Sequence, residues 1–114
     1  MENTETRLRR AAMQRDFRDV LIRDYRESLD AWHGRLADLH AANGFLPPET
    51  AVTFDTHYEA LRSGVEEARL ELASLERVRN DDGAWAAVAK RLEAAWQRVK
   101  ETGARLAELV EGRA

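Results

Sequence analysis

Apolar residues recur through the middle of the chain at alternating steps of four and three. The stripe comprises Phe54, Tyr58, Leu61, Val65, Ala68, Leu72 and Leu75. This spacing places the side chains along one narrow side of an α-helix. Such a stripe has to be buried against other helices, so the pattern predicts a helical bundle. On its own it indicates no chemistry.

Two further segments carry related patterns. From about residue 83 to 111 the 4-3 spacing repeats, with a glycine at one position where a large residue is due. Its members are Trp85, Val88, Leu92, Trp96, Val99, Gly103, Leu106 and Val110. The first segment keeps this spacing from Trp32 onward, but Met13, Phe17, Leu21, Tyr25 and Leu29 step by fours. A repeated step of four winds the stripe around a helix, so this part is expected to curve or to face more than one neighbour.

Charged residues on the first segment are spaced for ion pairs within one helix. We expect pairs between side chains four residues apart, which lie close together on a helix surface. The candidates are Arg15–Asp19, Asp19–Arg23, Arg23–Glu27 and Arg26–Asp30.

Two short clusters predict turns. At the first, Gly44 is expected to adopt a left-handed conformation, with Phe45 folding back toward Leu39. Proline cannot continue a preceding helix but fits the first turn of a new one, so Pro48 should lie near the start of the second helix. At the second turn, Asn80-Asp81-Asp82-Gly83, Asp81 or Asp82 is placed to cap the third helix.

Together these patterns predict an all-α fold, an elongated antiparallel three-helix bundle similar to a spectrin-like coiled coil. We expect one domain over residues 1–114, with helices at about 4–42, 48–79 and 83–111. Folding the chain about its turns places Leu36 near His57, and brings Trp32 to the level of residue 101, where its ring could fill the space left by Gly103. Plain tolerance of a glycine within the helix is the alternative. The same alignment leaves residues 1–13 projecting past the bundle.

The projecting segment is the candidate site. An apolar stripe that extends past its bundle either finds a partner or frays. We expect a partner interface there, either a homodimer or a contact with another protein. Fraying and coverage by the C-terminal tail are the alternatives. The candidate interface residues are Leu8, Arg9, Ala12, Met13 and Phe17.

Composition narrows the class of protein. The chain has 114 residues, of which 44% are hydrophobic and 34% charged, and a net charge of −3. This balance is typical of a charge-covered helical domain. There is no cysteine, so disulfides and thiolate metal sites are excluded. The polar first residues do not resemble a signal peptide, and no apolar run reaches membrane-spanning length, so we expect a cytoplasmic protein.

Candidate chemistry is sparse. His33, His40 and His57 fall near the first turn, but no two have the i,i+4 spacing of a helical metal site, and no metal or other cofactor is expected. No nucleophile motif, phosphate loop or pair of carboxylates in a cleft is evident. We therefore expect no enzyme and no small-molecule substrate.

Nucleic acid and membranes are also disfavoured as partners. Arg7, Arg9, Arg10, Arg15 and Arg18 form a local basic run that could meet phosphates. Phe17 is the one aromatic residue within this run and does not make a stacking platform for bases, so nucleic acid is not expected. A chain that is net acidic and poor in lysine is poorly suited to anionic lipid.

The aromatic pattern resembles a group of small bacterial coiled-coil proteins, some of them associated with stress. The likeness spans residues 24–110 and rests on four motifs: Tyr25-x3-Leu29-x2-Trp32, Tyr58-x2-Leu61, Gly83-Ala84-Trp85 and Ala94-Ala95-Trp96. The arginine-rich start and the Phe45-Leu46-Pro47-Pro48 turn depart from that pattern. The chain is also similar, more weakly, to granule-coating phasins.

The resemblance implies an architecture and no functional residues. From it and from the seams we expect a non-enzymatic scaffold or interaction protein that acts through helix faces. The alternative is a peripheral coat protein that binds a granule or membrane surface through amphipathic helices.

Overall fold

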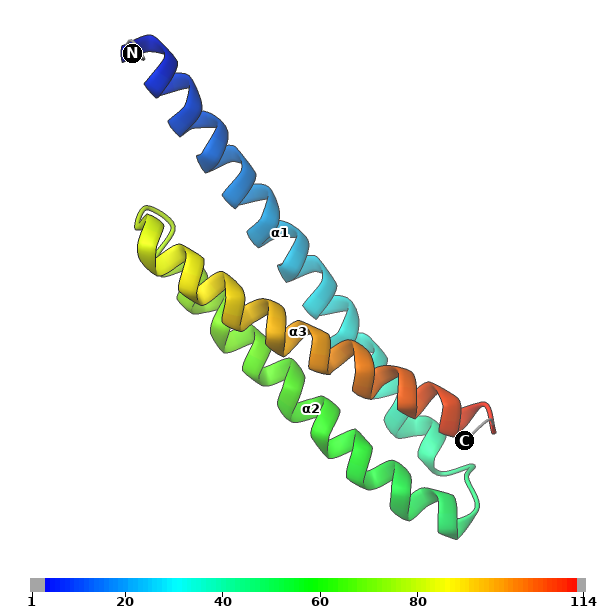
Figure 1. Cartoon of the computed structure of the whole chain (residues 1–114). Helices are drawn as coiled ribbons and strands as arrows, with labels where there is room; N and C mark the ends of the chain where they lie inside the picture. The colour runs from blue at the N-terminus through cyan, green and yellow to red at the C-terminus, as the bar shows by residue number, and fades with distance from the viewer. Residues whose placement is uncertain (1–3, 113–114) are drawn as a thin grey trace.

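The protein is an all-α three-helix bundle in the computed structural model, which describes residues 4–112. Helix α1 spans Thr4–Asn43, α2 spans Pro48–Arg77 and α3 spans Asp82–Val110. The bundle is elongated, 67 × 20 × 18 Å, and consecutive helices run in opposite directions (Figure 1). The expected fold class is confirmed, and the expected helix ends lie within about two residues of the observed ones.

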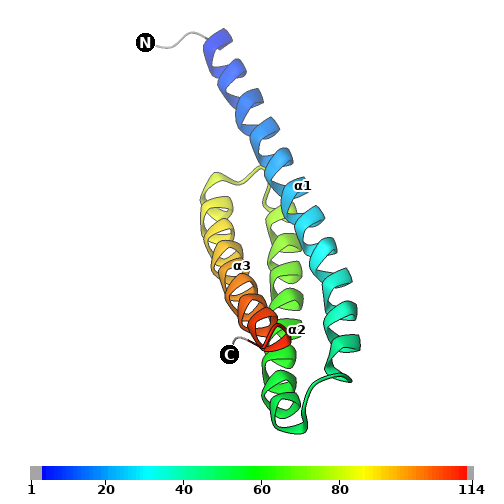
Figure 2. The ribbon, with the colours of Figure 1, turned by 90° about the vertical axis from the view of Figure 1, so that its right-hand side faces the viewer.

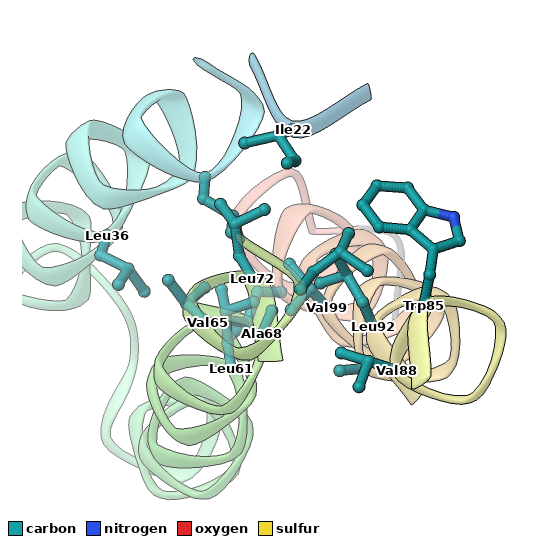
Figure 3. Packing of buried hydrophobic residues seen from close by; sticks show 14 of the residues in the cluster. Ile22, Leu36, Leu61, Val65, Ala68, Leu72, Trp85, Val88, Leu92 and Val99 are labelled. Carbon is teal, nitrogen blue, oxygen red and sulfur yellow. The ribbon is translucent and has the colours of Figure 1, made fainter. Parts of the chain in front are cut away.

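The core is shared unequally among the helices (Figure 3). Helix α2 buries Phe54, Leu61, Val65, Ala68, Leu72 and Leu75, and α3 buries Trp85, Val88, Leu92, Ala95, Val99 and Leu106. Helix α1, the longest, buries only Ile22, Leu29 and Leu36. Leu21 and Tyr25 are half-buried at the edge of this core. The α1 residues that pack against the core, Ile22, Tyr25, Leu29, Trp32 and Leu36, keep a 3-4 spacing. The difference arises because α1 continues past the end of α2 and α3, so its N-terminal part extends beyond both helices (Figure 1).

The first turn differs from the expectation in two respects. Within residues 4–112 only Gly112 has a positive φ, so Gly44 is not left-handed. Phe45 is 91% exposed, and Leu46 packs against the core in its place. The chain leaves α1 through i to i+3 hydrogen bonds, from Phe45 N to Ala42 O (3.1 Å) and from Leu46 N to Asn43 O (3.2 Å). These bonds satisfy the last carbonyls without a left-handed residue.

The path of this turn sets the register of α1 against α2. Asn43 Nδ2 donates to Asp55 Oδ1 (2.9 Å), and Arg79 Nε lies 3.2 Å from Asp19 Oδ1. Leu36 therefore lies opposite a position near Arg62, and the predicted proximity of Leu36 to His57 is wrong by about five residues. The reason is that residues 44–47 descend past the end of α1 before α2 begins (Figure 1). Five residues of helix correspond to about 7.5 Å, so several residues of the connection contribute, and the extended Pro47 (φ −58°, ψ 149°) is one of them.

The second turn follows the expectation. Asp81 is the residue before α3, and its carboxylate Oδ1 accepts a hydrogen bond from Ala84 N (3.1 Å). This satisfies one of the free amides of the first turn of the helix, and the negative charge opposes the helix dipole. Pro48 likewise lies in the first turn of α2, where its missing N–H costs nothing.

Trp32 of α1 fills the space beside Gly103 of α3, as the alignment predicted. A Cβ atom on Gly103 would lie 2.8 Å from Trp32 Cζ3 and closer still to Cη2. Two turns along both helices from this contact, the ring of Tyr25 meets that of Trp96 edge-on, with centroids 6.1 Å apart. Large rings on α1 thus bridge the gap to α3 at a few points along the seam.

Ion pairs form between helices more than within α1. Asp19 pairs with Arg79, Asp30 with Arg69 (3.1 Å), and Arg26 with Glu76, all from α1 to α2 or its end. These contacts replace three of the expected pairs within α1, namely Arg15–Asp19, Asp19–Arg23 and Arg26–Asp30. Carboxylates at the edge of a buried stripe can reach the neighbouring helix, and the helical spacing alone does not show which partner is nearer.

Candidate interaction surface on the projecting half of α1

The N-terminal part of α1 extends beyond the turn that joins α2 to α3 (Figures 1 and 2). The last contact between α1 and that turn is made by Arg18, whose side chain reaches Arg79 and Asp82. The projection therefore covers residues up to about 17, longer than the expected 13. The register shift at the first turn causes this, since it lowers α2 and α3 relative to α1. Residues 1–3 of the expected projection lie outside the described part of the chain.

Arg18 anchors the base of the projection. Its guanidinium donates to the backbone oxygen of Arg79 and to Asp82 Oδ1, both at 2.7 Å. The same group lies over the Trp85 ring, 4.8 Å from the centroid, and the side chain is only 13% exposed. Two charge-assisted hydrogen bonds and a cation–π contact thus hold α1 to the end of the bundle.

Large apolar side chains on the projection face solvent. Met13 is 71% exposed, Phe17 65% and Leu8 64%, and Val20, just past the Arg18 anchor, is 42% exposed. Singly exposed apolar residues are ordinary on protein surfaces, whereas several on consecutive turns of one helix are typical of interaction surfaces.

The five candidate residues do not share one face. Arg9, Met13 and Phe17 line a groove of about 580 Å³ against Trp85, together with Thr6, Arg10, Gln14 and Arg18. Leu8 and Ala12 do not line this groove. At about 100° per residue, Leu8 lies roughly 140° around the helix from Met13, and Ala12 about 100°.

Sequence reasoning missed two members of this surface. Trp85 was expected in the core and is buried there, with 9% of its surface exposed. It also lines the groove. Val20 was passed over, although it continues a 4-3 spacing from Met13 and Phe17. This 4-3 spacing could have identified Val20 as a member of the surface. The steps of four through Leu21 indicated a different stripe.

Charge is distributed unevenly between the projection and the bundle. Residues 4–18 contain five arginines against Glu5 and Asp16, a net charge of +3. Residues 19–112 contain 12 basic and 18 acidic side chains, a net charge of −6. Arg9 is partly neutralised by Glu5, at 2.6 Å on the same helix. The projection is therefore a basic, apolar helix on an acidic body, and it suits a partner with exposed carboxylates.

The histidines do not form a metal site with their neighbours. His33 lines a shallow groove between α1 and α2, and the His40 ring lies against Tyr58, with centroids 5.7 Å apart. His57 does not line that groove. Within residues 4–112, no group of three or more histidine or carboxylate side chains is placed to hold a metal ion.

One phenol at the α1–α3 seam has a perturbed acidity. Burial raises the pKa of Tyr25, and the negative charge of Glu93 raises it further. Tyr25 is partly buried because it packs against Trp96 at that seam, so the packing of α1 on α3 explains its environment.

None of the described helices combines the length and the apolar character needed to cross a membrane. Comparison with protein-family models, with curated proteins and with solved structures gave no match to this chain.

Proposed function

We propose that this chain is a non-enzymatic helical interaction module that binds another protein chain through the projecting half of α1. The observation that carries the proposal is the exposed apolar stripe Met13, Phe17 and Val20 on a helix anchored at its base by Arg18. The proposal assigns no substrate, cofactor or catalytic residue. Its setting is the bacterial cytoplasm, in the stress-associated context that the resemblance implies.

Energy and preorganisation both support association at this face. Full burial of a Phe or Met side chain is worth about 1.5–3 kcal/mol, and Met13 and Phe17 are each about two-thirds exposed. Because the segment is already helical and tethered, a partner does not have to offset the entropy of folding it. An amphipathic helix of this kind is recognised by another helix or by an apolar groove.

The bundle itself argues against the alternative of a surface coat. A coat that spread on a granule or membrane would have to expose the seams of α2 and α3. Their central residues Leu61, Leu92 and Leu106 are fully buried. Opening the bundle would cost the burial of the whole core, whereas the projecting stripe is available without any opening.

A photo-crosslinking experiment in the source cells tests the proposal. A benzophenone amino acid replaces Phe17 in one variant, and Leu70 in a matched control, because Leu70 is equally exposed (65%) but lies far along α2 from Val52, the other large apolar side chain exposed on that helix. We expect protein adducts from position 17 and few from position 70. Adducts to lipid or granule material from position 17, or equal yields at both positions, would contradict the proposal.

A further inference from the structure

A second heptad stripe runs along α1 on a face of the helix away from the core stripe. It comprises Thr6, Arg10, Met13, Phe17, Val20, Asp24 and Glu27, at alternating steps of four and three. This stripe is separate from the core stripe: Ile22 lies about 180° around the helix from Met13. It is apolar in its centre, basic toward the N-terminus and acidic toward the C-terminus. All seven of its members are exposed.

We infer that the occupant of this stripe is a second copy of the same chain, packed antiparallel with Phe17 at the two-fold axis. The inference rests on the proposed function and specifies its partner and geometry. In this arrangement the two Phe17 rings meet at the centre. Met13 of each copy then lies within one residue of the level of Val20 of the other, which places apolar side chains together in three successive layers.

Charge complementarity selects this orientation. An antiparallel pair centred on Phe17 sets Arg10 of each copy against Asp24 of the other, and brings Glu27 to the level of the basic end. A parallel pair would set Arg10 against Arg10 and Asp24 against Asp24. Like charges in register disfavour the parallel pair, and the symmetric antiparallel contact forms twice in each dimer.

The shape of the chain allows the contact. The projection ends at Arg18, so the bundle of each copy extends away from the axis in opposite directions (Figure 2). Only α1 is needed for the interface, over the roughly 33 Å from Thr6 to Glu27 at about 1.5 Å per residue. A single helix pair of this length lies at the small end of specific interfaces, so we expect a dissociation constant in the micromolar range.

Charge reversal tests both partner and orientation. Sedimentation equilibrium from about 1 to 200 µM should give a monomer–dimer equilibrium for the unmodified chain. The variant R10D should weaken it at least about tenfold, since it creates two repulsive contacts per dimer. The double variant R10D/D24R should restore it, because the pairs are exchanged. R105D, an exposed reversal at the far end of α3, is the matched control and should dimerise normally. Circular dichroism verifies that each variant is folded.

Disulfide trapping reads the register directly, because the chain contains no cysteine. A mixture of R10C and D24C should oxidise to a mixed disulfide dimer, while R10C alone should not, since its two copies are about 21 Å apart along the pair. Rapid crosslinking of R10C alone would overturn the antiparallel geometry. A failure of R10D/D24R to recover dimerisation would overturn it as well.

The outcomes separate this inference from the proposed function. A chain that stays monomeric at 200 µM overturns the second copy as partner. If photo-crosslinking at position 17 then captures a different protein, the interaction module stands and the dimer does not. If position 17 captures no protein, both fail.

Discussion

Single side chains set the fine structure of the α1–α3 seam. Trp32 and Gly103 fit as a large ring against a position without a side chain, and this contact was predictable because both residues fall at one level of a regular bundle. The exposure of Phe45 and the inward placement of Leu46 were not predictable. Which of two adjacent apolar residues in a turn points inward depends on the path of a few backbone torsions, and the helical period carries no information about them.

Replacing Gly103 by alanine should destabilise the protein by about 1 kcal/mol. The new Cβ overlaps the Trp32 ring, an overpacking cost of about 1–3 kcal/mol, against a gain of about 1 kcal/mol in helix propensity. Gly34 is the matched control: its Cβ would meet nothing within 4 Å, so Gly34→Ala should stabilise by about 1 kcal/mol. Urea unfolding measures both. If Gly103→Ala also destabilises in a Trp32→Ala background, the ring is not the cause.

Tyr25 should make the fold sensitive to strongly alkaline pH. Its pKa is raised in the folded state, by burial first and by Glu93 second. The neutral phenol therefore favours folding, a contribution that is complete below the unfolded pKa of about 10 and is lost as pH rises through the folded value. Thermal unfolding at pH 8 and at pH 11 should show a smaller loss of Tm for Tyr25→Phe than for the unmodified chain. An equal loss in both would show that other groups govern the transition.

At the scale of elements, α2 and α3 form a closely packed pair and α1 is the more loosely held helix. The contact stripe of α1 keeps the 4-3 spacing through Ile22, Leu29 and Leu36, but the helix continues beyond the other two (Figure 1). The sequence, through the steps of four before Trp32, indicated that this part of α1 curves or faces more than one neighbour. It did not show where the departure begins, because that depends on the Arg18 contacts to Arg79 and Asp82, which link residues more than 60 apart in the chain.

Removing the Arg18 side chain should free the base of the projection. Arg18→Ala loses two charge-assisted hydrogen bonds and the contact with Trp85, and we expect a loss of about 1–2 kcal/mol in unfolding free energy. Amide exchange at residues 10–20 should accelerate more than exchange in α2 or α3. Arg15→Ala, an exposed arginine on the same segment, should change neither quantity. Equal exchange rates in the two variants would mean that Arg18 does not anchor α1.

At the scale of the whole molecule, the chain is 67 Å long and consists of an acidic bundle with a basic helical extension. The bundle buries its own seams and leaves one apolar stripe uncovered, at the end where the charge changes sign. Three of the five interface candidates, Arg9, Met13 and Phe17, line one groove there, while Leu8 and Ala12 lie on other faces of the helix. This asymmetry supports the proposed association through the stripe, and the charge pattern supports the proposed antiparallel orientation.

The sequence by itself determined the three helices, most of their apolar stripes, a cap at Asp81 or Asp82 and the existence of a projecting segment. These are local properties, since helical period, proline and capping groups act within a few residues of one another. Only the tertiary structure decided how far α1 projects and which of its faces is left open. Both depend on the register of α1 against α2, which differs by about five residues from the register expected from the sequence. The difference arises because the connection that contains Pro47 runs along the bundle axis. A register is fixed by loop path and by packing between distant residues, and so the length of the exposed stripe became visible only in the assembled bundle.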